Sequence, residues 1–104
     1  MELTGKCKIK FRNYLEKQTI ENKLVSYGYD IFYQLPQSMQ YGVYVDFFDS
    51  VSLNIYVKPL SNKKWSVYID DYGVHIVDYY LVKDTRQEAR EEAIEKANEI
   101  YNEK

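Results

Sequence analysis

Apolar and polar residues alternate along the middle of the chain, between residues 41 and 82. This rhythm of two is typical of β-strands with one buried face, because successive side chains point to opposite sides of a strand. Short segments rich in Asp, Ser, Asn and Gly separate the apolar runs, and they favour the tight turns of an antiparallel meander. The pattern predicts three or four strands, over residues 41–48, 51–58, 64–70 and 74–82.

Helical spacing replaces this rhythm near the start of the chain. Cys7, Phe11 and Leu15 recur every four residues, which forms an apolar stripe along one side of a helix. We therefore predict a helix over residues 5–17, with Thr4 as its N-cap.

Residues 18–40 are less regular than the segments on either side of them. A short helical turn is expected over residues 31–35, and Pro36 should end it, because the residue before a proline disfavours the helical conformation. The side chains of Phe32 and Leu35 in this turn are expected to pack at the edge of the core.

A helix-capping motif near the end of the chain predicts a second long helix. Thr85 and Glu88 have the spacing of a capping box, and residues with helical spacing continue to about Asn102. One face of the sheet must be buried under helices. The expected fold is therefore a single α+β domain, residues 1–104, with an antiparallel three- or four-stranded meander sheet and the N- and C-terminal helices packed on one face.

The two sides of the predicted strands differ in composition. Leu53 and Ile55 belong to an aliphatic row that should face the core, whereas tyrosines recur on the opposite side. Tyrosine offers a large, stiff surface with one polar tip, and it is enriched in binding interfaces. The candidate protein-binding residues on this side are Tyr44, Phe48, Tyr56, Lys58 and Tyr68, with Tyr79 as a further member.

The tyrosine row also admits two interpretations without a binding partner. Tyrosine has a high β-propensity and can occupy a strand for that reason alone. Alternatively, residues 18–40 fold over this side of the sheet and bury it.

Catalytic and metal-binding chemistry finds little support in the sequence. The chain has one Cys and one His, too few for an internal disulfide or for a zinc site built from these residues, and we expect no cofactor. Cys7 and His75 could form a nucleophilic pair, but Cys7 lies on the apolar stripe and is expected to be buried and inert. Asp46 and Asp78 could meet only if their strands pair suitably. We therefore expect a protein that is not an enzyme.

The absence of a signal-peptide pattern and of a run of about 20 apolar residues predicts a cytoplasmic protein without a membrane span. A single cysteine agrees with a reducing compartment, because small secreted domains usually carry several disulfides.

Nucleic-acid binding is the alternative function. Residues 1–26 have a net charge of +3, from six Lys and Arg against three Glu. The order helix, three strands, helix is that of the double-stranded-RNA-binding domain, although the start of the last helix is mixed and net acidic. The cationic residues of the first helix that would contact phosphates are Lys6, Lys8, Lys10 and Arg12.

Three stretches of the sequence carry a resemblance to other proteins. They are Leu3 to Lys8 (LTGKCK), Tyr44 to Ser50 (YVDFFDS), and the segments Thr85 to Arg90 (TRQEAR) and Ala93 to Tyr101 (AIEKANEIY). Together they resemble small uncharacterised proteins found in phages and prophages of gut bacteria. This resemblance implies a bacterial host cytoplasm and a small accessory protein that binds a host protein, inhibition of defence machinery being one such role.

Self-association into a homodimer is a third possibility, beside binding of a partner protein and binding of nucleic acid.

Overall fold

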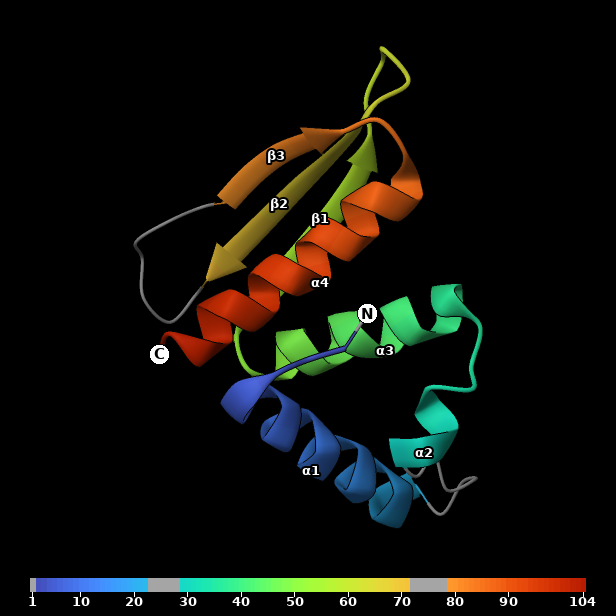
Figure 1. The fold of residues 1–104 in the computed structure, drawn as a ribbon, viewed down its shortest axis with the longest axis vertical. Coiled ribbons are helices and arrows are strands. Elements are labelled where there is room, and N and C mark those ends of the chain that lie inside the picture. Colours follow the sequence, from blue (N-terminus) through green and yellow to red (C-terminus); the bar gives the residue numbers. More distant parts are fainter. Residues whose placement is uncertain (1, 23–28, 72–78) are drawn as a thin grey trace.

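Four helices and three strands form the described part of the chain (Figure 1). The computed structural model describes residues 2–22, 29–71 and 79–104. The class is α+β with an antiparallel sheet, as predicted. The elements are α1 (Gly5–Asn22), α2 (Tyr29–Phe32), α3 (Gln37–Ser50), β1 (Leu53–Pro59), β2 (Trp65–Asp71), β3 (Tyr79–Lys83) and α4 (Arg86–Asn102).

The sheet is an antiparallel meander with the order β1-β2-β3. The strands predicted over residues 51–58 and 64–70 coincide with β1 and β2 to within two residues. The last predicted strand, 74–82, overlaps β3, while its residues 74–78 lie outside the described part of the chain. The meander and its connectivity are therefore confirmed for three strands.

The strand predicted over residues 41–48 is wrong, because this segment lies within helix α3. The carbonyl of Pro36 accepts hydrogen bonds from the N–H groups of Met39 and Gln40, both at 3.0 Å. Pro36 therefore begins a helix, which suits its fixed φ of −56°, instead of only ending the preceding turn.

Two periods compete in this segment, and tertiary packing decides between them. Tyr41, Val43, Val45 and Phe47 alternate like a strand, whereas the spacing of Tyr44, Phe47 and Phe48 is helical. The three residues of the helical set are fully buried, with an exposed fraction of 0% each. Burial of three aromatic side chains outweighs the β-propensity of the segment.

Helix α4 lies across one face of the sheet and contacts all three strands (Figure 1). Its predicted start is confirmed, since the Thr85 hydroxyl oxygen accepts a hydrogen bond from the Glu88 N–H at 3.1 Å. Helix α3 packs against β1, and α1 packs against α4 and α2. Helix α4 therefore covers one face of the sheet, α3 lies against β1, and α1 joins the core through its contacts with α4 and α2.

Phe11 is the centre of an aromatic cluster that joins the three N-terminal helices. Its ring centroid lies 4.9 Å from that of Phe32, 5.0 Å from that of Tyr44 and 5.1 Å from that of Phe47. Edge-on and tilted contacts of this kind add to the free energy gained from burial alone. The cluster explains why residues 31–35 pack against α1 and α3.

Two asparagines of α4 hold the start of α1. Asn98 accepts a hydrogen bond from the Thr4 N–H at 3.0 Å and donates to the Thr4 hydroxyl at 3.0 Å. Asn102 accepts from the Cys7 N–H at 2.8 Å and donates to the Thr4 carbonyl at 2.9 Å. Thr4 precedes the helix as predicted, but the side chain that caps the Cys7 N–H comes from the far end of the sequence.

None of the helices in the described ranges is long and apolar enough to cross a membrane.

Candidate functional site

Three tyrosines stand in one row across the outer face of the sheet. The strand register pairs Tyr56 with Tyr68 and Tyr68 with Tyr80. Tyr56 is 39% exposed and Tyr80 is 59% exposed, while Tyr68 between them is half-buried. The rings of Tyr56 and Tyr68 are in contact, with centroids 5.9 Å apart and an interplanar angle of 41°. The row therefore places three aromatic side chains side by side on one face of the sheet, and the first two of them are in ring contact.

Alternation along the strands places this row opposite the core. Ile55, Val67 and Ile69 are buried on the side of the sheet that α4 covers. Their neighbours along each strand, Tyr56 on β1 and Tyr68 on β2, consequently point to the other side, because side chains alternate across a strand. The aliphatic row predicted from the sequence is confirmed as the core side of β1 and β2.

Polar side chains border the tyrosine row on both sides. The Lys58 ammonium lies 5.6 Å from the ring centroid of Tyr56, within the range of a cation–π contact. Ser66 donates from its hydroxyl to the Lys58 carbonyl at 3.4 Å. Together these side chains line an open groove of about 500 Å³. We call its six residues the tyrosine face: Tyr56, Lys58, Ser66, Tyr68, Asp70 and Tyr80.

Tyr44 and Phe48 are not part of the tyrosine face, contrary to the prediction. Both side chains lie on α3 and are fully buried, because the segment is a helix and not an outer strand. Tyr56, Lys58 and Tyr68 do lie together as predicted.

Tyr80 is the member of the face that the sequence pattern does not identify. Its strand alternates ambiguously, and the pattern favours Tyr79 for this side. The register decides the matter, because it aligns Tyr80, and not Tyr79, with Tyr68. Tyr80 can be identified once the register between β2 and β3 is known, because residues paired directly across two antiparallel strands lie on the same face of the sheet.

The described part of residues 18–40 packs away from the tyrosine face. Phe32 lies in the aromatic cluster with Phe11 and Tyr44, and α2 contacts α1. Leu35 packs against the same core. Residues 31–40 therefore do not cover the tyrosine face, and residues 23–28 lie outside the described part of the chain.

The cationic residues of α1 are exposed but divided between two flanks of the helix. Lys6 and Lys10 are one turn apart, and so are Lys8 and Arg12, but the two pairs differ by about 160° around the helix axis. Lys6 also donates to the Lys104 carbonyl at 2.7 Å, and Arg12 lies 3.7 Å from the Glu16 carboxylate. The four residues therefore do not form one stripe of positive charge.

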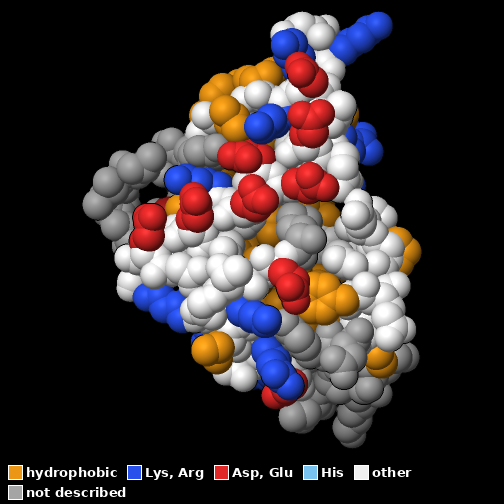
Figure 2. All heavy atoms as spheres, viewed as in Figure 1, with side chains coloured by type: hydrophobic (Ala, Val, Ile, Leu, Met, Phe, Trp, Pro, Cys, Tyr) orange, Lys and Arg blue, Asp and Glu red, His pale blue; other side chains and the backbone are white. Residues whose placement is uncertain are grey.

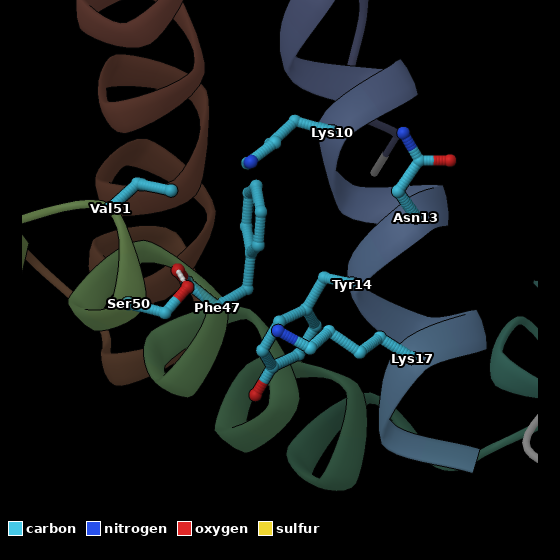
Figure 3. Close-up of a pocket in the computed structure, with 7 residues that line it drawn as sticks. All are labelled: Lys10, Asn13, Tyr14, Lys17, Phe47, Ser50 and Val51. Atoms are coloured by element: carbon cyan, nitrogen blue, oxygen red, sulfur yellow. Dashed lines mark hydrogen bonds between the residues drawn. The ribbon is translucent and has the colours of Figure 1, made fainter. Parts of the chain in front are cut away.

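A cleft of about 310 Å³ lies between α1 and α3, beside the aromatic contacts that join them (Figure 3). Lys10 and Lys17 extend from α1 toward α3, and Asn13 also lines the cleft (Figure 3). The pKa of Tyr14, which lines the cleft, is raised by burial and by the negative charges of Asp46 and Asp49. Acidic residues of α3 thus offset the lysines at this edge of α1.

The exposed side of α4 is predominantly acidic. Figure 2 shows acidic side chains gathered along this helix. Because α4 packs on the core side of the strands, these acidic side chains and the tyrosine face lie on opposite sides of the sheet. Near its start, Arg86 lies over the Trp65 ring at 4.5 Å and Arg90 over the Tyr41 ring at 4.7 Å. These two arginines therefore pack against aromatic rings at the start of the last helix. This is the position where the double-stranded-RNA-binding domain presents its cations to phosphates.

Cys7 is fully buried, and burial raises the pKa of its thiol from 9.0 to about 12. A thiol in this state is protonated at neutral pH and does not act as a nucleophile. Its predicted partner, His75, and Asp78 both lie outside the described residues. Within residues 2–22, 29–71 and 79–104 no group of three or more His, Cys, Asp and Glu side chains is arranged to hold a metal ion.

Comparison with known proteins gives no relative for this chain: no protein-family model, no curated protein and no solved structure matches it.

Proposed function

We propose that this protein is a non-enzymatic binding protein that engages a partner protein through the tyrosine face. The observation that carries the proposal is the row Tyr56–Tyr68–Tyr80, three aromatic side chains in register on the side of the sheet opposite α4. A surface of this composition resembles the aromatic centre of protein interfaces, where tyrosine is enriched.

The proposed biological setting follows the resemblance of the sequence to phage and prophage proteins. In this setting the protein acts in the cytoplasm of a bacterial host as an accessory protein. Its partner is a host protein, and inhibition of a defence system is the activity that this binding would serve.

Affinity capture with matched variants tests the binding function. The tagged protein is incubated with host-cell lysate, with nuclease and at two salt concentrations, beside Tyr56→Ala, Tyr80→Ala and Ile9→Ala variants. Ile9 is an apolar side chain that is 65% exposed on α1, so its variant controls for general loss of exposed apolar surface. We expect a host protein to be retained by the unmodified protein and by Ile9→Ala, and lost from both tyrosine variants. Equal retention by all four proteins would refute a role for the tyrosine face.

The alternative function is nucleic-acid binding through α1, favoured by the exposure of Lys6, Lys8, Lys10 and Arg12. It predicts an affinity that falls steeply with salt and that is lost when Lys8, Lys10 and Arg12 are changed to Glu. Binding to a labelled RNA duplex and to a single strand, measured over a range of salt concentrations, tests it. Salt-independent binding, or none, would eliminate this alternative.

A further inference from the structure

The tyrosine face is small compared with the surface that a folded partner needs. Strands of seven residues at about 3.3 Å per residue, and three strands about 4.8 Å apart, give a face of roughly 23 by 14 Å, or about 320 Å². A folded partner in a stable complex covers about 800 Å² on each side. The face therefore matches a short extended segment of a partner better than the surface of a globular domain.

The groups that the face presents limit the conformation of that segment. Backbone donors and acceptors of the strands lie in the plane of the sheet, so a segment above the face cannot bind by adding a strand. An amphipathic helix needs an apolar groove, whereas Lys58, Ser66 and Asp70 line this one. A polyproline II helix is the common binding mode that uses an aromatic groove with polar groups beside it.

The spacing of the tyrosines agrees with this conformation. Tyr56 and Tyr80 are aligned across β2, two strand spacings or about 10 Å apart. One turn of polyproline II contains three residues and spans about 9.3 Å. Prolines at positions i and i+3 of a segment that runs across the strands would thus lie beside Tyr56 and Tyr80, with Tyr68 between them.

The polar chemistry of the face also suits such a segment. Polyproline II has no internal hydrogen bonds, so its carbonyl groups are available as acceptors. The hydroxyls of Tyr56 and Tyr80 and the ammonium of Lys58 are donors. Lys58 and Asp70 have opposite charges, which leaves the six residues of the face without net charge and disfavours a polyanion such as single-stranded nucleic acid.

We infer that the tyrosine face binds a proline-rich segment of its partner in the polyproline II conformation, with the prolines of a Pro-x-x-Pro repeat on Tyr56 and Tyr80. This inference rests on the proposed function, because it names the kind of segment that the face takes.

Two matched peptide pools test the inference by fluorescence anisotropy. The first is a pool of labelled decapeptides with proline fixed at two positions three residues apart, and the second has alanine at those positions. We expect the proline pool to bind at least about tenfold more tightly than the alanine pool, and Tyr56→Ala and Tyr80→Ala each to weaken it about tenfold. The Ile9→Ala variant should bind like the unmodified protein.

Amide chemical shifts of the unmodified, ¹⁵N-labelled protein locate the binding site without any substitution. Addition of the proline pool should shift residues 54–58, 66–70 and 80–82, and a deoxythymidine decamer should shift none of them. Equal binding of the two pools, no binding, shifts centred on α1, or shifts of the face by the oligonucleotide would each overturn the inference. Host-protein capture that depends on Tyr56 and Tyr80, together with no binding of the proline pool, would reject polyproline recognition but keep the proposed function. Capture that is independent of both tyrosines would reject the proposed function itself.

Discussion

Asn102 accepts a hydrogen bond from the backbone N–H of Cys7 at 2.8 Å, and this contact joins the end of α4 to the first turn of α1. The amide of the same Asn102 donates to the Thr4 carbonyl at 2.9 Å. One side chain therefore satisfies two backbone groups at a helix start, where N–H groups have no partner within the helix.

Removal of this side chain should destabilise the protein. We expect Asn102→Ala to lower the free energy of unfolding by about 1–2 kcal/mol, because the Cys7 N–H loses its partner and the Thr4 carbonyl keeps only the hydrogen bond from the Lys8 N–H. Urea denaturation measures the change. Asn62→Ala is the control: it removes the hydrogen bond that the Asn62 side chain accepts from the Lys64 N–H in the exposed β1–β2 loop, where water can replace it, and it should cost clearly less than Asn102→Ala. Equal stability of the two variants would contradict the capping role.

Two glycines should respond to the same substitution with opposite signs. Gly5 has a φ of +61°, and an added Cβ would lie 3.0 Å from Asn102 Oδ1, so Gly5→Ala should destabilise by about 1–2 kcal/mol. Gly42 lies in α3 with nothing within 4 Å of the added Cβ, so Gly42→Ala should stabilise by about 0.5–1 kcal/mol. Thermal unfolding of the pair checks both signs, and a destabilising Gly42→Ala would argue against the helix.

Substitution of two tyrosines distinguishes the helix α3 from the strand predicted there. Tyr44 is fully buried beside Phe11, and Tyr44→Ala should cost about 3–5 kcal/mol or prevent folding. Tyr56 lies on the outer face, and Tyr56→Ala should cost no more than about 1 kcal/mol. Chemical denaturation measures both. Similar losses for the two variants would mean that Tyr44 and Tyr56 share one environment, as the alternation in the sequence suggests.

The buried thiol of Cys7 should make stability fall at alkaline pH. Burial raises its pKa from 9.0 to about 12, so folding favours the protonated thiol. This contribution is complete below pH 9, where the thiol is protonated in both states, and it declines as pH rises toward 12, because the unfolded chain ionises first. The loss is up to about 1.4 kcal/mol per pH unit for one proton.

Comparison with Cys7→Ala isolates this effect, because Tyr14 and Tyr41 also have pKa values raised by burial and contribute with the same sign. The free energy of unfolding is measured by urea between pH 8 and pH 11. The unmodified protein should lose stability more steeply than the variant above pH 9. Parallel curves would show that the thiol does not resist ionisation in the folded state.

Local signals predict α4, β1 and β2 correctly because each segment carries one period and a clear boundary. The capping box at Thr85 and Glu88 marks the start of α4, and the aliphatic residues Leu53 and Ile55 mark the inner side of β1. Residues 41–48 carry two periods at once, so only their packing against Phe11 and Phe32 decides the structure. That packing involves residues far apart in the sequence, and no local pattern contains it.

The candidate site is predictable in part for the same reason. Tyr56, Lys58 and Tyr68 lie on strands with an unambiguous inner side, and they do meet on the outer face. Tyr80 requires the register between β2 and β3, and exclusion of Tyr44 and Phe48 requires the helix α3. Asn98 and Asn102, which cap the start of α1, lie more than 90 positions after Thr4 and Cys7 in the sequence, so no local pattern predicts their contacts.

The hydrogen bonds that join Thr4 and Cys7 to the asparagines of α4 also have a consequence for folding during synthesis on the ribosome. A ribosome that has added Cys7 must add 95 further residues before Asn102 can reach the Cys7 N–H. Contacts of such long sequence separation form late, since loop closure has to precede them. The start of α1 is therefore fixed late, after the aromatic cluster around Phe11 has joined the same helix to Phe32, Tyr44 and Phe47.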